Sequence, residues 1–129
     1  MDKLKHSDIT GAIIRSFYTV YNSLGYGFLE KVYENALLIE LREVGLIVEQ
    51  QKPINVFYKD QLVGEYFADL IVSNTVIVEL KTAVTISRSH EAQLLNYLRA
   101  TDIEVGLLLN FGPTAEYKRK IFDNEPTSI

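Results

Sequence analysis

Apolar residues recur at helical spacing over the first third of the chain. One series follows Asp8, a residue type that caps helix N-termini, and stops at Gly25, a residue type that ends helices. Its members are Ile9, Ile13, Phe17, Val20, Tyr21 and Leu24. A second series runs from about Phe28 to Val44 and ends before Gly45. The pattern therefore predicts two leading helices.

The middle of the chain changes to strand-like patterns separated by turn residues. Three strands are predicted, at Ile47 to Tyr58 with an irregularity at Pro53, Gln61 to Val72, and Val76 to Lys81. The segment Tyr58-Lys59-Asp60-Gln61 supplies a tight turn between the first two. The third strand is apolar on both faces, which is typical of a central strand that is covered on each side.

A helix and a further strand complete the predicted fold. The helix runs from about Arg88 to Thr101, and the strand from Val105 to Phe111 stops before Gly112-Pro113. A strand, a crossover helix and a following strand in one sheet should be parallel and right-handed. We therefore predict one α/β domain over residues 1–129, with a mixed four-stranded sheet flanked by helices. Its sheet combines an antiparallel three-strand meander with a parallel strand after the crossover helix, and residues 1–7 and 123–129 are expected to be loose.

Composition limits the classes of protein. The 129 residues, 47% of them hydrophobic, suffice for one core but not for a second domain. The absence of cysteine excludes disulfides, thiolate zinc sites and a cysteine nucleophile. Residues Met1 to His6 lack the apolar run of a signal peptide, and the longest uninterrupted apolar stretch is Ala36 to Ile39. A cytoplasmic protein without membrane contact is expected.

The charge balance argues against tight binding to duplex DNA. The chain has 13 basic and 17 acidic residues, a net charge of −4, whereas nucleic-acid binders usually present a basic surface. A nuclease is not excluded, because a bound metal ion offsets local carboxylates. The basic run Lys118-Arg119-Lys120 can be read either as a charged edge strand protected against aggregation or as a track for phosphates.

Charged residues at the ends of two apolar strands are the strongest sign of chemistry. Ionised side chains are rarely left on buried strands unless they are paired or bind an ion. Glu79 and Lys81 share one face of their strand because side chains alternate across a strand. Whether Asp69 joins them depends on the turn between the strands. We predict a three-residue loop from Ser73 to Thr75, with Asn74 at its middle, because it sets Asp69 opposite Glu79, whereas a two-residue turn would not.

Two facing carboxylates repel each other unless a cation lies between them. The oxygens of an Asp and a Glu suit a hard ion such as Mg²⁺ or Mn²⁺, so Asp69 and Glu79 are the predicted metal ligands. Lys81 would stand beside the ion, where its ammonium can orient or help to deprotonate a water, or stabilise charge on a phosphate. The alternative is an ordinary ion pair between Lys81 and a neighbouring acid on the sheet surface.

These residues resemble a known family. Asp69, nine intervening residues and Glu79-Leu80-Lys81 are similar to the core motif of the PD-(D/E)XK nuclease superfamily. The segment Gly27-Phe28-Leu29-Glu30-Lys31-Val32-Tyr33 resembles the signature of the small GxxExxY proteins of that superfamily. Gln93-Leu94-Leu95-Asn96-Tyr97 is similar to the Gln-x-x-x-Tyr element of its RecB-type branch. The resemblance implies a restriction-endonuclease-like core.

The resemblance also implies a third acid near the metal. Glu30 would approach the ion or its water shell from the second helix, and its projection inside the apolar stripe, between Leu37 and Leu41, predicts that it faces inward. The alternative is a helix N-terminal glutamate favoured by the helix dipole. Tyr33, one turn further, could hydrogen-bond Glu30 or the substrate, or it could simply belong to the core.

Three residues of the crossover helix form a polar stripe. His90, Gln93 and Tyr97 occur at i, i+3 and i+7, so they share one face. Gln93 could donate to a metal-bound water or a substrate phosphate and Tyr97 could add a second hydrogen bond. Alternatively, Gln93 bonds the sheet backbone while Tyr97 packs. His90 is a candidate phosphate contact or proton shuttle, against the reading of a structural histidine, and Arg88 is a candidate substrate contact.

The function predicted from these residues is a Mg²⁺- or Mn²⁺-dependent hydrolase of phosphodiester bonds in nucleic acid, with DNA as the expected substrate. The catalytic residues would be Asp69, Glu79, Lys81, Glu30, Gln93 and Tyr97. The alternative is a catalytically inactive module of nuclease fold that binds nucleic acid or a protein partner. A homodimer is a further expectation, because a small nuclease commonly needs a second subunit to reach two strands.

Overall fold

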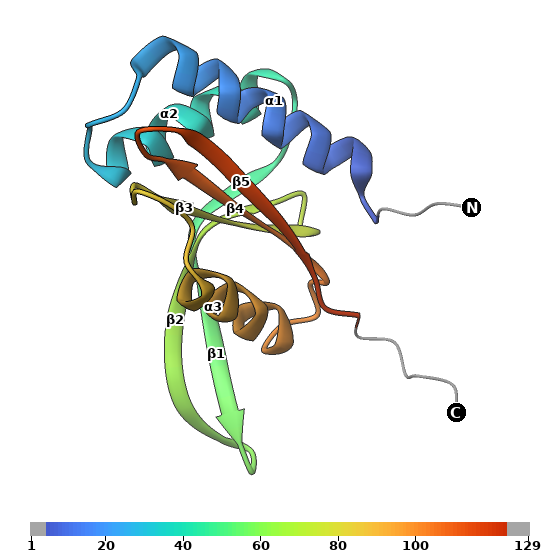
Figure 1. Cartoon of the computed structure of the whole chain (residues 1–129). Helices are drawn as coiled ribbons and strands as arrows, with labels where there is room; N and C mark the ends of the chain where they lie inside the picture. The colour runs from blue at the N-terminus through green and yellow to red at the C-terminus, as the bar shows by residue number, and fades with distance from the viewer. Residues whose placement is uncertain (1–4, 124–129) are drawn as a thin grey trace.

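Five strands form one mixed sheet that carries helices on both faces (Figure 1). The computed structural model describes residues 5–123. Its elements are α1 (Ser7–Leu24), α2 (Glu30–Glu43), β1 (Val48–Tyr58), β2 (Gln61–Val72), β3 (Val76–Lys81), α3 (Arg88–Arg99), β4 (Val105–Phe111) and β5 (Ala115–Ile121). None of the helices in this part of the chain is long and apolar enough to cross a membrane.

The sheet has the order β1-β2-β3-β4-β5, with β3 at its centre. The first three strands are antiparallel, β4 runs parallel to β3 after the crossover helix α3, and β5 is antiparallel to β4. The predicted α/β class, the meander and the parallel strand are confirmed, but the prediction of four strands is wrong. The sequence of β5 gave no signal because this edge strand buries none of its residues fully.

Alternating side chains of β3 serve two separate cores. Val76, Val78 and Leu80 pack against α1 and α2, whereas Ile77 packs with Leu94 and other apolar residues of α3 on the opposite face. All of these side chains are completely buried. The apolar character of β3 on both faces therefore follows from its place between two layers of helices.

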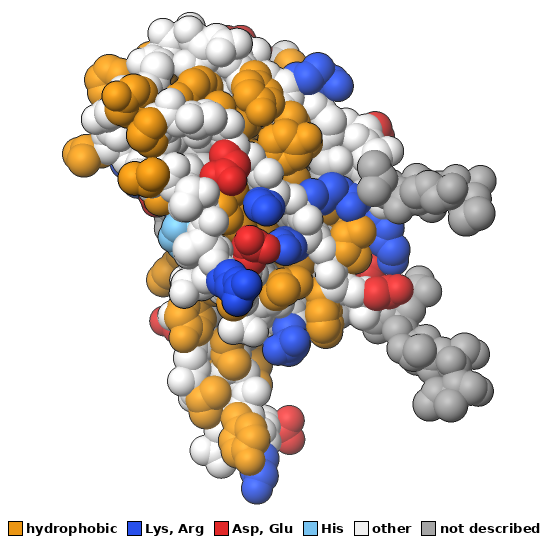
Figure 2. All heavy atoms as spheres, viewed as in Figure 1, with side chains coloured by type: hydrophobic (Ala, Val, Ile, Leu, Met, Phe, Trp, Pro, Cys, Tyr) orange, Lys and Arg blue, Asp and Glu red, His pale blue; other side chains and the backbone are white. Residues whose placement is uncertain are grey.

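The basic run lies on the edge strand β5. Figure 2 shows Lys and Arg side chains gathered over β5 and α3, with acidic side chains among them. Lys120 forms an ion pair with Glu91 of α3, and Arg119 Nη2 donates a hydrogen bond of 2.6 Å to the carbonyl oxygen of Lys5. Two of its three basic residues therefore make structural contacts, as expected of a charged edge strand.

Helices α1 and α2 start at other residues than predicted, whereas α3 starts at Arg88 as predicted and ends at Arg99 instead of Thr101. Helix α1 is capped by His6, in the left-handed region at φ 54°, rather than by Asp8, because the Thr10 N–H already bonds the His6 carbonyl at 2.9 Å. Residues 5–7, expected to be loose, are held in place, with Lys5 Nζ 2.6 Å from Glu104 Oε1. Asp123, of the expected loose tail, is also placed, whereas residues 1–4 and 124–129 lie outside the described residues.

β1 is irregular at Gln51 and at a register shift between Val56 and Phe57, not at Pro53. Pro53 stays in register opposite Phe67, which an edge strand tolerates because its outer N–H groups need no partner. Gln51 has a φ of 52° and skips its pairing. Beyond this point the β1–β2 hairpin extends past the rest of the sheet and lies alongside α3 (Figure 1). Its tip, Lys59-Asp60, has two positive φ values, as the predicted tight turn requires.

A close backbone approach holds the chain directly after β3. The completely buried Asn110 of β4 accepts a hydrogen bond from the Ala83 N–H and donates one to the Ala83 carbonyl, both at 2.9 Å. Gly112 lies against the same carbonyl, so that a Cβ atom on it would come within 2.0 Å of the Ala83 oxygen. The end of β3 is therefore anchored to β4 by side-chain amide bonds and a tight contact.

Gly112→Ala should lower the free energy of unfolding by about 1–3 kcal/mol, because one of two backbones must move to make room. Urea denaturation would measure the change. Gly11→Ala is the matched control: Gly11 lies inside α1, where a Cβ meets only the flexible end of Arg15, and alanine should stabilise the helix by about 0.5–1 kcal/mol. Equal effects of both substitutions would contradict the proposed contact.

Candidate functional site

The predicted register of β2 and β3 is confirmed. Val72 pairs with Val76 and Leu70 with Val78, which leaves a three-residue loop. Ser73 and Asn74 in this loop have φ values of 52° and 55°, in the left-handed region. The same register, continued by one residue, places Asp69 opposite Glu79.

At Asp69 and Glu79, hydrogen bonds between β2 and β3 run from backbone N–H groups to side-chain carboxylates instead of to backbone carbonyls. The Asp69 N–H donates to Glu79 Oε2 at 2.8 Å, and the Leu80 N–H donates to Asp69 Oδ2 at 2.9 Å. Each carboxylate is thus bound by the backbone of the opposite strand. Asp69 Oδ1 also accepts a hydrogen bond of 3.2 Å from Gln51 Nε2, while no residue of the described chain bonds Glu79 Oε1. The two acids are oriented, and one oxygen remains available for a ligand.

Burial makes ionisation of these acids unfavourable. Glu79 is 5% exposed, and its burial, together with the negative charge of Asp69, raises its pKa to about 8. Burial is also the main cause that raises the pKa of Asp69. The nearby Lys81 ammonium lowers both pKa values, but by less than burial raises them. The pair therefore has too little positive charge around it to stay fully ionised.

Glu30 lies near this pair from the first turn of α2. Its pKa is raised, first by desolvation of the carboxylate and then by the charge of Asp69, and is lowered by Lys81. The residue as a whole is exposed to solvent, yet its carboxylate is partly desolvated on the side of Asp69 and Lys81, so it faces the pair without being buried. It does share the stripe of Leu37 and Leu41, but α2 begins at Glu30, so no further turn covers that end.

Two carboxylates, those of Asp69 and Glu79, are arranged to suit a metal ion, rather than a group of three. Within residues 5–123, no group of three His, Cys, Asp or Glu side chains is arranged so that it could hold an ion. Mg²⁺, however, usually binds through one or two carboxylates and keeps water and substrate oxygens in its other positions. Asp69 and Glu79 suit that pattern, and the assignment of Glu30 to the metal remains a prediction.

Lys81 contacts Gln93 rather than an acid. Its Nζ atom donates a hydrogen bond of 3.3 Å to Gln93 Oε1, and Lys81 forms no salt bridge with any carboxylate in the described part of the chain. The alternative of an ordinary surface ion pair is therefore not what the structure shows. Gln93 likewise bonds a side chain of the site instead of the sheet backbone.

Tyr97 combines core packing with a place in the site. It is 7% exposed and belongs to the apolar cluster under α3. Burial raises the pKa of its hydroxyl to about 12, and the charges of Glu79 and Asp69 add to the shift. The ring of Tyr66 from β2 lies beside it, with centroids 5.7 Å apart. Both predicted roles of Tyr97 are therefore compatible with its position.

His90 has a structural role at the start of α3. Its Nδ1 accepts from the Ser87 N–H, and its own N–H donates to Ser87 Oγ, both at 3.1 Å. Partial burial and the charge of Lys81 lower its pKa, so the ring is neutral at neutral pH with its proton on Nε2. His90 therefore has the structural role that was the alternative, in the N-terminal cap of α3, while a phosphate contact by His90 stays a prediction. Arg88, exposed at the first position of α3, also stays a predicted substrate contact.

Tyr33 ties down the loop before Glu30 instead of bonding Glu30. The residue is completely buried, and its ring stacks on Phe111 with centroids 4.4 Å apart. Its hydroxyl donates to the Gly25 carbonyl at 2.7 Å and accepts from the Phe28 N–H at 3.2 Å. Of the alternatives for Tyr33, the place in the core is confirmed and the hydrogen bond to Glu30 is not formed; Tyr33 instead holds the loop before Glu30.

Glu34 and Gln51 are site residues that the sequence analysis missed. Glu34 is 3% exposed and accepts hydrogen bonds from Lys31 at 3.0 Å, Gln50 at 2.6 Å and Gln51 at 3.1 Å. The Gln51 amide nitrogen also donates to Asp69, so it links the two carboxylates. Glu34 was detectable, since it lies in the buried stripe three residues before Leu37. Gln51 was not, because its orientation depends on the left-handed kink in β1.

Comparisons with known proteins agree with this geometry. A family model described as the PD-(D/E)XK nuclease superfamily matches residues 7–121. A solved structure titled "Crystal structure of SSO0001" is similar with a TM-score of 0.57 at 17% sequence identity, which shows a shared fold. The match covers 96% of this chain and 62% of that one, so this chain spans less than two thirds of that protein's length. No curated protein matches the sequence.

The stability of the metal-free protein should fall as pH rises from about 5 to 8. Glu79 has a pKa of about 8 in the folded state against 4.5 in the unfolded chain, so the folded protein holds a proton that the unfolded chain has released. In the wild type this difference should lower the free energy of unfolding by on the order of 3 kcal/mol between pH 5 and 8, and Glu79→Gln should remove that decrease. Urea denaturation at several pH values, in a chelator, measures it.

The exposed Glu65→Gln on β2 serves as the control for this experiment and should keep the wild-type pH dependence. A wild-type protein whose free energy of unfolding does not change between pH 5 and 8 would contradict the raised pKa of Glu79.

Glu34→Leu should lower the free energy of unfolding by about 1–3 kcal/mol, because the buried Glu34 carboxylate is a shared acceptor for the side chains of Lys31, Gln50 and Gln51. Chemical denaturation compares it with Glu43→Leu, an exposed position of the same helix where a change within about 0.5 kcal/mol is expected. If Glu34→Leu and Glu43→Leu have the same free energy of unfolding, the hydrogen bonds accepted by Glu34 do not stabilise the fold.

Proposed function

Because the chain belongs to the PD-(D/E)XK nuclease superfamily, we propose that it is a metal-dependent nuclease that hydrolyses phosphodiester bonds in DNA. The observation that carries the proposal is the reciprocal bonding of Asp69 and Glu79 at the ends of β2 and β3, with Lys81 beside them. Two desolvated carboxylates and an ammonium at one place are costly to the fold, and a phosphate-hydrolysing site gives each of them a role.

Asp69 and Glu79 are the residues that would hold Mg²⁺ or Mn²⁺, which when bound supplies a Lewis acid for a phosphate oxygen and lowers the pKa of water. Both side chains must be ionised to act as ligands. Since the pKa of Glu79 is about 8, its proton has to leave as the ligand set forms, and binding should therefore strengthen as pH rises toward 8.

Lys81 would stabilise the charge that builds on the phosphate. Its ammonium has three donors, of which one is given to Gln93 Oε1. The others can donate to a non-bridging phosphate oxygen or to the attacking water. Because Gln93 is neutral, it fixes the direction of the ammonium without cancelling its positive charge, which is needed most in the transition state.

Glu30, Tyr97 and the amide of Gln93 would complete the site. Glu30 lies at the open end of α2, where its carboxylate can accept hydrogen bonds from water around the two ligands. Tyr97 keeps its hydroxyl proton at any physiological pH, since its pKa is about 12, and can therefore donate a hydrogen bond to the substrate. A homodimer and a cytoplasmic location remain part of the proposal.

A second candidate function is a non-catalytic module of nuclease fold that binds nucleic acid or a protein. The net charge of −4 favours the protein-binding form of this module, because a nuclease and a nucleic-acid binder must both approach a polyanion. The two functions differ in turnover, which an assay with divalent metal on single-stranded, duplex and branched DNA would detect.

Lys81→Ala should abolish DNA cleavage and leave metal binding largely intact, because Lys81 acts on the phosphate and is not a ligand. A Mg²⁺- or Mn²⁺-dependent nuclease assay and titration calorimetry measure the two properties. Asp69→Asn should lose both, since it removes a ligand charge. Lys59→Ala, at the hairpin tip, is the control and should cleave like the wild type. Full activity of the Lys81 variant would refute its role.

A further inference from the structure

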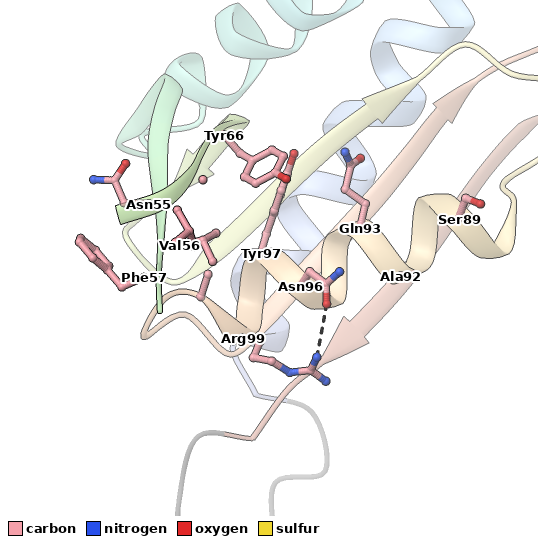
Figure 3. A pocket seen from close by; sticks show the side chains of 13 residues that line it. Asn55, Val56, Phe57, Tyr66, Ser89, Ala92, Gln93, Asn96, Tyr97 and Arg99 are labelled. Carbon is pink, nitrogen blue, oxygen red and sulfur yellow. Dashed lines mark hydrogen bonds between the residues drawn. The ribbon is translucent and has the colours of Figure 1, made fainter. Parts of the chain in front are cut away.

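A groove opens between the β1–β2 hairpin and α3, next to the site (Figure 3). Its volume is about 870 Å³, and its walls come from one segment on each strand of the hairpin and from the outer face of α3. Gln93 and Tyr97 belong both to this groove and to the proposed catalytic site. A chain that lies in the groove is therefore led to Lys81 and the two carboxylates.

The lining of the groove differs from the rest of the protein in charge. None of the described residues that line it is Asp or Glu, although the chain carries 17 acidic residues. The side-chain amides of Gln93 and Asn96 on α3 line it, and Arg99 adds a guanidinium that donates to Asn96 Oδ1 at 3.4 Å. An anionic chain with hydrogen-bonding edges would meet no repulsion here and would find both donors and acceptors.

An aromatic face is open at the end of the same groove that borders the site. Tyr66 is 47% exposed, although its ring is large. It stands beside Tyr97 (Figure 3), whereas the ring of Phe57 points away from α3 on the other side of β1. Exposed aromatic rings next to amides and a guanidinium are the means by which proteins stack and bind unpaired bases.

We propose that this groove binds a segment of single-stranded DNA, with a base stacked on Tyr66, and guides it into the nuclease site. This inference rests on the proposed function and names its substrate class. In a duplex the base faces are covered by stacking, so only an unpaired strand can offer them to Tyr66. The volume also lies within the range of about 300–1,000 Å³ typical of pockets for ligands the size of one or a few nucleotides.

The test measures binding apart from cleavage. Fluorescence anisotropy in a chelator follows a labelled oligodeoxythymidylate, a DNA duplex of the same length and an oligouridylate. The wild type should bind the single-stranded DNA more tightly than the other two. Tyr66→Ala should weaken this binding by about fivefold or more, because base stacking on an aromatic ring is lost. Tyr117→Ala on β5 is the control, with a similar exposure of 41% outside the groove, and should bind like the wild type.

Tyr66→Leu is the second variant, because it keeps apolar contact with Tyr97 while it removes the aromatic face. It should fold and still lose binding. Unchanged binding by both Tyr66 variants, equal affinity for the duplex, or a preference for the RNA oligomer would overturn the proposal. A wild-type dimer that Tyr66→Ala dissociates in sedimentation, without oligonucleotide binding, would also overturn it.

A parallel nuclease assay separates this inference from the proposed function. Tyr66-dependent binding without cleavage of any substrate would refute the nuclease and leave the single-strand groove standing. Metal-dependent cleavage with binding that is indifferent to Tyr66 would refute the groove and leave the nuclease standing.

Discussion

The reciprocal hydrogen bonds between Asp69 and Glu79 are the constraint on which the rest of the site depends. Each carboxylate accepts from a backbone N–H of the opposite strand, at 2.8 and 2.9 Å. They hold two mutually repelling acids at one place, although burial and mutual charge raise the pKa of Glu79 to about 8. A shift of register by one residue would move one acid to the other face of the sheet and remove the site.

Neutral amides support this charged centre from three directions. Gln51 donates to Asp69 while it is bonded to the buried Glu34, Gln93 accepts from Lys81, and Asn110 holds the chain after Lys81 through Ala83. An amide can orient an ion without changing the net charge around it. This matters here, because the site already has more negative than positive groups.

The distribution of charge matters more than its sum. The net charge of −4 argues against avid binding of duplex DNA along the whole surface. None of the described residues that line the groove beside the site is acidic, however. A small acidic protein can therefore present one local surface suited to an anionic strand, formed where the β1–β2 hairpin lies alongside α3 (Figure 1).

The sequence by itself determined the central strand, the register of Asp69 and Glu79, and the ends of helices α1 and α2. These features follow from local rules: side chains alternate on a strand, a loop of three residues sets the pairing, and glycine ends a helix. Only the tertiary structure decided that Glu34 is buried and Glu30 exposed, that Tyr33 bonds a loop, and that β5 pairs with β4. Two acids on one helical stripe look alike in sequence. Their burial, and the pairing of an edge strand with little apolar signal, depend on which distant segments cover them.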